Sequence, residues 1–281
     1  MRHSRAPSPT AISSVSSLQE AIRDALGSDY ETFLQGSYKN DTSIREVNDV
    51  DIVALRKQTV SGVFSQEHYN SAISWNDIFV TLKDKLEDAA RFRGKASFGD
   101  KCVIIKDTFN ADVVPAVRIG DYGKDPIAIY SFREGAERLN NPRVHYANGV
   151  RKHEATGKTF KPLVRMFKNW AANHWPDESV APSFYVECLV YNVLDGQFQN
   201  DLARAFFSVG YWIEQNILPS PAPVVWSVAQ DKDILVEKEW KRADYSRFHT
   251  QLVNSTSKVA AALSADTVAA ATRNWRAAFN E

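Results

Sequence analysis

The stretch GSY at 36–38, followed by NDVDIV at 48–53, decides how the first part of this chain folds. Side chains on a β-strand alternate between its two faces, so Asp49 and Asp51 share one face while the apolar residues between and after them pack on the other. Two neighbouring carboxylates repel each other unless a cation neutralises them. Oxygen ligands at this spacing suit Mg²⁺ that carries phosphate groups. The stretch therefore indicates nucleotide chemistry.

A third carboxylate, Asp112, lies in the apolar, strand-like segment FNADVV at 109–114. A charge inside an apolar strand is unfavourable unless it is paired or bound to a metal. If this strand lies beside the first, three carboxylates surround a pair of Mg²⁺ ions that can clamp an in-line displacement at phosphorus. Asp49 and Asp51 would then bridge both ions. Asp112 would hold the ion that activates an acceptor hydroxyl, and could help to take its proton.

Two further features suit a triphosphate. Gly36 lets the backbone approach phosphate oxygens, and Ser37 with the amides after it can donate to them, especially if a helix starts there. Lys168 lies among apolar residues of an expected helix, where its ammonium could neutralise the β- and γ-phosphates. The alternative for Lys168 is a surface lysine that extends its charge into water.

Composition limits the class of protein. The chain has 281 residues and is 44% hydrophobic, enough for two lobes or one large domain. Its formal net charge is zero, so no global field draws it to nucleic acid or to an anionic membrane. Two cysteines and six scattered histidines suit neither a disulfide scaffold nor a usual zinc site. We find no apolar run of about 18 residues and expect no membrane span and a cytoplasmic location.

Hydrophobic periodicity predicts the elements. It indicates helices over 16–26, 75–92, 160–175, 183–194, 202–217, 245–263 and 267–279, and strands over 30–34, 50–55, 102–105, 109–117 and 127–132. The predicted elements are strands and helices before Pro142 and only helices after it. This change predicts a catalytic lobe over 1–142, flexible over 1–12, and a helical nucleotide-binding lobe over 143–281. The expected fold class is α+β: a mixed β-sheet with helices plus a helical C-terminal lobe, with the active site in the cleft between them.

The motifs quoted above, together with two further stretches, resemble sequences of a known family. GSY, NDVDIV and ADVVP (111–115) resemble the DNA polymerase β-type nucleotidyltransferase superfamily. Within it, HYANG (145–149) and PSFYVECLVYNV (182–193) resemble the CdnE clade of the bacterial cGAS/DncV-like nucleotidyltransferases, or CD-NTases. The resemblance covers about residues 33–198. It implies a polymerase β-type fold, two-metal nucleotidyl transfer with release of pyrophosphate, and an antiphage (CBASS-type) signal that a separate effector protein reads.

The resemblance also implies roles for single residues. Gly36 and Ser37 contact the donor triphosphate, and the triad that holds two Mg²⁺ ions, for which Mn²⁺ can substitute, consists of Asp49, Asp51 and Asp112. Phosphate ligands from the helical lobe are Lys168 and Ser183.

The resemblance further matches Asn148 to a residue that favours uracil, and an amide suits the O4 and N3–H edge of that base. The plain alternatives are that Ser183 caps its helix and that Asn148 lies in a turn before Gly149. Thr42 is expected to cap a short helix rather than to touch the site.

We therefore expect a monomeric enzyme that makes a cyclic dinucleotide from nucleoside triphosphates. Cyclic UMP–AMP from UTP and ATP is the first expectation, and cyclic di-UMP or a cyclic dipurine are the alternative products. The resemblance implies neither zinc nor direct DNA activation, because the chain lacks the residues for the zinc ribbon of DNA-sensing animal relatives. Two other functions stay open: a transferase of the same superfamily that acts on RNA or a protein, and a catalytically idle nucleotide-binding regulator.

Overall fold

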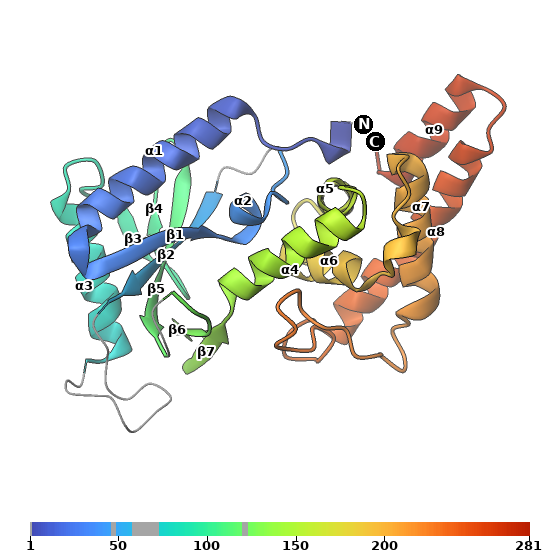
Figure 1. Cartoon of the computed structure of the whole chain (residues 1–281). Helices are drawn as coiled ribbons and strands as arrows, with labels where there is room; N and C mark the ends of the chain where they lie inside the picture. Colours follow the sequence, from blue (N-terminus) through green and yellow to red (C-terminus); the bar gives the residue numbers. More distant parts are fainter. Residues whose placement is uncertain (1, 46–48, 58–72, 120–122) are drawn as a thin grey trace. The chain divides into compact units, whose positions relative to one another are not determined.

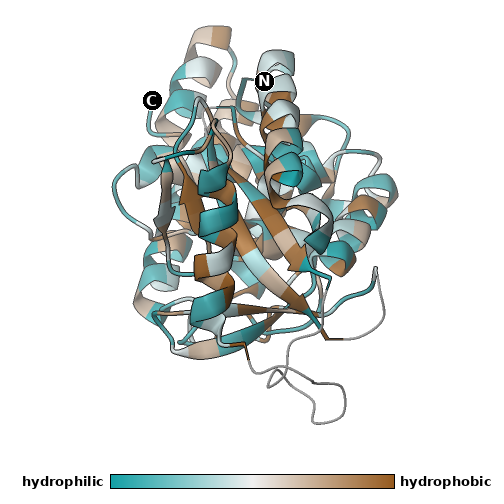
Figure 2. Ribbon diagram, turned by 90° about the vertical axis from the view of Figure 1, so that its left-hand side faces the viewer, coloured by the Kyte–Doolittle hydropathy of each residue, from teal (hydrophilic) through white to brown (hydrophobic). Residues whose placement is uncertain are grey.

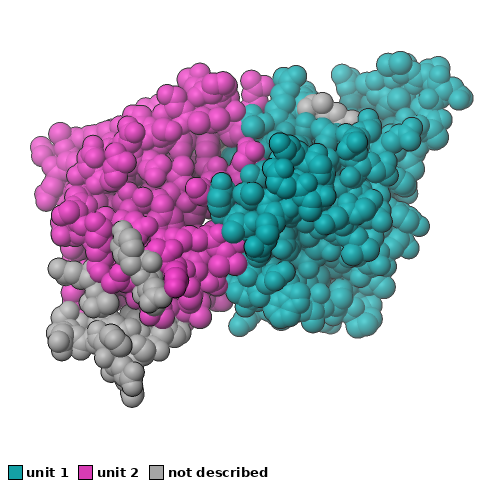
Figure 3. All heavy atoms as spheres, in the orientation of Figure 1, with its two compact units in different colours: residues 1–6, 42–44, 145–281 teal, residues 7–41, 45–144 magenta. Residues whose placement is uncertain are grey.

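The computed structural model describes residues 2–45, 49–57, 73–119 and 123–281, so Asn48 of the opening motif lies outside the described residues. The chain divides into two compact units, coloured separately in Figure 3. The sheet unit comprises Pro7–Asp41 and Arg45–Val144, and the helical unit comprises Met1–Ala6, Thr42–Ile44 and His145–Glu281. The predicted lobe boundary at residue 142 stays a prediction.

Within the described residues, the sheet unit holds one mixed sheet of seven strands in the order β1-β2-β5-β4-β3, with β6 on β5 and β7 on β6. The strands are β1 Tyr30–Gln35, β2 Asp49–Arg56, β3 Ala96–Phe98, β4 Val103–Ile105, β5 Asn110–Arg118, β6 Ile127–Ser131 and β7 Ala136–Asn140. All five predicted strands are confirmed. The two that were missed are a three-residue strand, β3, and the mostly polar AERLN of β7.

Helices α1 Pro9–Leu26 and α3 Trp75–Asp88 cover one face of this sheet (Figure 1). Their apolar stripes pack against the alternate strand residues Val50, Ile52 and Val113, and Figure 2 shows such apolar segments in brown. Helix α1 begins seven residues before its predicted start, because Ser8 Oγ accepts the amide of Ala11 and so caps a first turn that a proline opens.

Helix α3 ends earlier than predicted, because Ala89 has an extended backbone with ψ at 129°. The expected helix over 75–92 is therefore confirmed only as far as Asp88. A short helix that we did not predict as an element, α2 Gly36–Asn40, follows β1 directly. Its first residues are the Gly-Ser pair of the opening motif, which satisfies the condition that a helix starts there.

The helical unit contains α4 Pro142–Ala155, whose first three residues belong to the sheet unit, and the helices that follow it. These are α5 Phe160–His174, α6 Ser183–Asn192, α7 Leu202–Asn216, α8 Arg242–Leu263 and α9 Val268–Ala278. A 3₁₀ turn, Arg2–Ser4, also belongs to this unit. The five predicted helices are confirmed. Helix α4 was missed because its sequence has no apolar stripe; its buried residues are Asn148 and Gly149.

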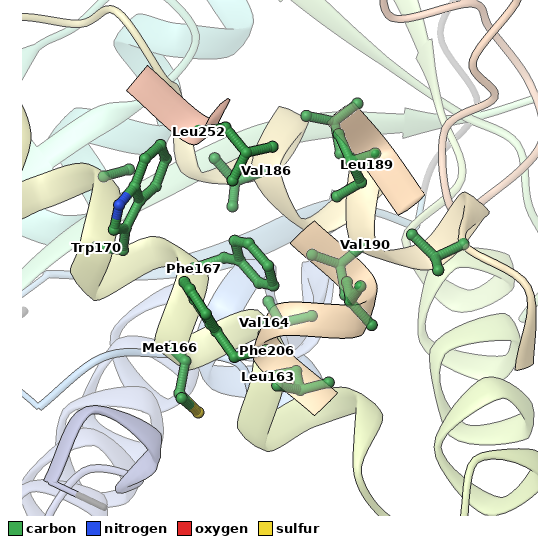
Figure 4. Packing of buried hydrophobic residues seen from close by; sticks show 14 of the residues in the cluster. Leu163, Val164, Met166, Phe167, Trp170, Val186, Leu189, Val190, Phe206 and Leu252 are labelled. Atoms are coloured by element: carbon green, nitrogen blue, oxygen red, sulfur yellow. The ribbon is translucent and has the colours of Figure 1, made fainter. Parts of the chain in front are cut away.

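Helix α5 packs in the helical core with α6, α7 and α8, and Figure 4 labels buried residues of all four helices. Its apolar residues recur at helical spacing, so they form one buried stripe. Phe167 stacks on Phe206 of α7 with ring centres 4.3 Å apart. Trp170 donates its indole N–H to Ser255 Oγ and to the carbonyl of Ala278, which satisfies its one polar group inside the core. Among the described residues, no helix combines the length and apolar character that crossing a membrane requires.

Candidate active site

The Gly-Ser turn lies directly against the strand that carries two of the aspartates. Gln35, the last residue of β1, is the register partner of Asp51 on β2. The chain then turns at Gly36 with φ at 63°, a conformation that glycine adopts without a steric penalty. A Cβ atom at this position would lie 2.1 Å from Oδ2 of Asp51. The sequence therefore needs glycine at position 36 both for the turn and for the space beside this carboxylate.

The three aspartates lie on one face of two neighbouring strands. Strands β2 and β5 are parallel, with Asp51 opposite Asp112 and Asp49 opposite Asn110. Neighbouring strands lie about 4.8 Å apart, and residues two apart on a strand lie about 6.7 Å apart on the same face. This is the face turned away from α1 and α3, and further along it β2 continues with the buried Val53. The condition that the strand of Asp112 lies beside the strand of Asp49 and Asp51 is therefore met.

Burial and mutual repulsion shape the charges of this group. Burial raises the pKa of Asp112 and the Asp49 carboxylate raises it further, against a hydrogen bond from the Cys102 thiol that lowers it. Burial, followed by the Asp112 and Asp51 charges, raises the pKa of Cys102 to about 12. Burial and the charge of Asp49 likewise raise the pKa of Tyr38 on α2. The negative potential of the aspartates therefore reaches the residues around them, as a cation site requires.

The donor set fits a divalent cation in its chemistry and in its backbone spacing. Carboxylate oxygens on rigid strands are the ligands that Mg²⁺ prefers. Within the described ranges, however, no group of three or more His, Cys, Asp or Glu side chains already has the geometry of a metal centre. The register of Asp51 and Asp112, together with the space kept by Gly36, is thus the observation that supports a metal here.

Lys168, predicted as a phosphate ligand, is buried in the helical unit, with a side chain only 3% exposed. Its ammonium donates to Glu187 Oε2 at 2.7 Å and to Thr42 Oγ1 at 3.1 Å. The alternative of a surface lysine is therefore wrong. The Thr42 hydroxyl donates to the same Glu187 oxygen at 2.7 Å, so this residue belongs to a buried network and not to a helix cap.

Ser183 is the first residue of α6, is exposed, and lies in the same unit as Lys168. Pro182 occupies the N-cap position, and no side chain caps this helix. The alternative that Ser183 is a plain cap is therefore wrong. The phosphate role of Ser183 stays a prediction.

Asn148 lies inside α4 and is 5% exposed, so the alternative of a turn residue is wrong. Its Nδ2 donates to the carbonyl of Val228 at 2.7 Å, and its Oδ1 accepts from Arg151. Both ends of the amide therefore have protein partners, and a base could use the amide only by sharing or replacing them. Base recognition by Asn148 stays a prediction.

Sequence reasoning missed Glu187, which accepts from Lys168 and Thr42 and contacts His145 Nε2 at 3.0 Å through its other oxygen. Burial would raise the pKa of Glu187, but the Lys168 ammonium and the His145 hydrogen bond together lower it well below its ordinary value. A lone charge in the apolar segment SFYVECLV was the available signal. The same argument had singled out Asp112.

A mixed sheet of this topology, with aspartates paired across parallel strands and a separate helical unit, defines a nucleotidyltransferase. The chain belongs to the cGAS/DncV-like nucleotidyltransferases, the family of the bacterial cyclic nucleotide synthases. The sequence profile of the family's C-terminal helical domain matches residues 147–257. Enzymes of this family generally use divalent metal ions, and nucleotides are their substrates.

Two curated relatives and one solved structure illustrate the similarity. A cyclic UMP-AMP synthase of Rhodothermus marinus is 31% identical over 204 residues, which is 66% of this chain and 70% of the relative. A cyclic dipurine nucleotide synthase of Elizabethkingia meningoseptica is 30% identical over 209 residues, again 66% and 70%. The structure of the Rhodothermus marinus CdnE c-UMP-AMP synthase with Apcpp and Upnpp matches with a TM-score of 0.70 and 27% identity, over 90% of this chain and 94% of that one.

Proposed function

We propose that this chain makes a cyclic dinucleotide second messenger from nucleoside triphosphates, with two Mg²⁺ ions held by Asp49, Asp51 and Asp112. The observation that carries the proposal is the register of Asp51 and Asp112 on parallel strands, beside the turn at Gly36. When bound, the ions neutralise the phosphate charges and favour ionisation of the attacking hydroxyl.

Each of the predicted site residues has its own role in this reaction. Gly36 and Ser37 hold the donor triphosphate through the backbone and a hydroxyl. Asp112 is placed on the strand beside Asp51 and is suited to accept the proton of the attacking 3′-hydroxyl. Lys168 and Ser183 bind phosphate oxygens. Two successive attacks on an α-phosphate, each releasing pyrophosphate, first join two nucleotides and then close the ring.

Cyclic UMP–AMP is the product that we propose first, with UTP and ATP as substrates. A relative of that name and the presence of Asn148 support it. Relatives of similar identity carry other names: a cyclic dipurine synthase is 30% identical, and a Legionella pneumophila cyclic dipyrimidine synthase is 31% identical. Cyclic di-UMP and a cyclic dipurine are therefore the alternative products.

The test is a reaction with each labelled triphosphate alone and in pairs, with Mg²⁺ or Mn²⁺ and across a range of pH, followed by phosphatase and mass spectrometry. A phosphatase-resistant product that needs both UTP and ATP supports the proposal. Label that appears on RNA or protein would instead favour a transferase of the same superfamily. Tight triphosphate binding without turnover would favour an idle regulator.

We further propose that the product serves an antiphage response in the bacterial cytoplasm through a separate effector protein. The support is the membership of the chain in a family of bacterial signal synthases. Phage challenge of cells that express the chain with its genomic neighbours tests it. Protection should disappear when both Asp49 and Asp51 are replaced by asparagine, and protection that persists would contradict the proposal.

A further inference from the structure

The helical unit contains a buried, charged network whose centre is Glu187 and not Lys168. One carboxylate oxygen, Oε2, accepts from the Lys168 ammonium and from the Thr42 hydroxyl, each at 2.7 Å. The other, Oε1, lies 3.0 Å from His145 Nε2. The side chains of Glu187 and Lys168 are 4% and 3% exposed, and that of His145 is 12% exposed. Three separate segments of the helical unit, 42–44, α4 and α5, thus meet at one carboxylate on α6.

Such a network constrains the Lys168 ammonium. A lysine has three N–H donors, and the described contacts of Lys168, to Glu187 and Thr42, use two of them. A buried ammonium without a counter-charge would favour its neutral form, which binds phosphate poorly. Glu187 therefore supplies the counter-charge of the Lys168 ammonium and fixes the direction of its head group.

Thr42 connects the network with the first half of the proposed site along the chain. It lies five residues after Ser37 and seven before Asp49, between α2 and β2. The segment Thr42–Ile44 is nevertheless part of the helical unit, and Thr42 is 1% exposed. The hydroxyl bonds to Glu187 and Lys168 thus hold Thr42 within the helical unit.

We propose that Glu187 is a positioning residue for nucleotide binding, which acts through Lys168 by holding its ammonium charged and oriented, with Thr42 and His145 as the supports of the carboxylate. This inference rests on the proposed function, because it takes a triphosphate as the ligand of Lys168. It adds a residue that neither binds substrate nor holds metal.

The test compares Glu187→Gln, Lys168→Met and the double variant, with Glu178→Gln as a matched control. Glu178 pairs with Arg247 on the surface and is 55% exposed. Glu187→Gln should raise KM for triphosphates and lower kcat/KM about 10-fold to 100-fold, as loss of an orienting partner does. If Glu187 acts through Lys168, the Glu187→Gln substitution should have little further effect in a chain that already carries Lys168→Met. The control should match the wild type.

The pH profile separates positioning from a general structural defect. Glu187 and Cys188 on α6 both interact with Lys168, and His145 of α4 contacts the other oxygen of Glu187. Without the Glu187 charge, burial disfavours the charged form of Lys168. The basic limb of kcat/KM should therefore move to lower pH. A merely structural role would lower the whole profile without moving it.

Two outcomes overturn the inference while the proposed function stands: an active wild type with an unaltered Glu187→Gln variant, or additive losses in the double variant. A wild type without any cyclic product would instead overturn the proposed function itself. If Glu187→Gln does not fold, Thr42→Val and His145→Gln remove single supports. Each of these two substitutions should raise KM for a triphosphate. The thermal unfolding midpoint should not fall enough to explain that increase. An unaltered KM in both variants would contradict the inference.

Discussion

The α-carbon of Gly36 faces the carboxylate of Asp51 so closely that a methyl group there would lie 2.1 Å from Oδ2. Gln35, one residue earlier, is the register partner of the same aspartate. The Gly-Ser turn and the two candidate metal ligands on β2, Asp49 and Asp51, are therefore parts of one local structure. It is built from the end of β1 and the start of β2. The adjacency arises from the hairpin-like pairing of these strands and from the left-handed backbone of Gly36.

This relationship predicts the effect of Gly36→Ala. The substitution strains a backbone with φ at 63° and also drives a methyl group into Asp51. We expect a loss of activity of about 100-fold or more, because displacement of a catalytic group by about 1 Å has effects of that size. Steady-state kinetics measure it. Gly94→Ala is the matched control: its φ is 71°, and nothing lies within 4 Å of the added methyl group. Equal activity losses in both variants would contradict a specific role for the space at Gly36.

Asn148→Ser has two expected effects. It leaves the Val228 carbonyl without its 2.7 Å donor, which should lower the free energy of unfolding by about 1–3 kcal/mol. If Asn148 also reads uracil, the variant should lose preference for UTP in a competition between labelled triphosphates. Unchanged use of UTP would contradict base recognition by this residue.

A second asparagine supplies the control for that experiment. Asn192 donates to the carbonyl of Trp226 at 2.7 Å and so holds the same loop as Asn148 does through Val228. Asn192→Ser should loosen the loop but leave the preference for UTP intact. A loss of preference in both variants would show that the loop, and not the Asn148 amide, determines the base.

The two thiols should be inert in the folded protein. Cys102 is 8% exposed, and burial with the neighbouring aspartate charges raises its pKa to about 12. Burial raises the pKa of Cys188 as well. Since only a thiolate reacts rapidly, we expect far less than one equivalent of reaction with a disulfide reagent at pH 8 and two equivalents after unfolding. Rapid reaction of a native thiol would contradict the described packing.

Glu187 should make stability sensitive to acid. Its pKa in the folded protein lies below the ordinary 4.5, so the stability that it contributes is complete above that pH and is lost as the pH falls toward the folded value. Glu187→Gln should therefore be less stable than the wild type at pH 7, with a difference that shrinks below about pH 4.5, by up to about 1.4 kcal/mol per pH unit. Unfolding curves at several pH values measure this, and a constant difference would contradict it.

The sequence predicted best where the pattern is local and strongly apolar. The strands around Val53 and Val113 and the helix around Phe167 were confirmed, because alternation and helical spacing of buried residues identify such elements directly. Helix α4 was missed for the opposite reason: its buried positions are an asparagine and a glycine.

Part of the candidate site could be predicted from the sequence and part could not. A Gly-Ser turn and two aspartates on one strand are a local motif, and the cost of an isolated charge in a strand singled out Asp112 as a third candidate ligand. That Asp112 lies opposite Asp51 was only a condition of the sequence argument, and the structure supplies it. The network of Glu187 could not be predicted, because Thr42 and Glu187 are 145 residues apart in the chain. Only the folded structure shows which of several possible partners Lys168 has.

The most direct test of the central claim compares the wild type with the Asp49→Asn, Asp51→Asn double variant under Mg²⁺, with Asp24→Asn, a 76% exposed residue of α1, as control. The measurement is mass spectrometry of phosphatase-treated reactions with the four triphosphates, alongside thermal unfolding. The account predicts a cyclic dinucleotide from the wild type and the control, and none from the double variant. The double variant should unfold at a similar or higher temperature than the wild type, because the repulsion between the two carboxylates is relieved. Full product formation by a folded double variant would contradict it.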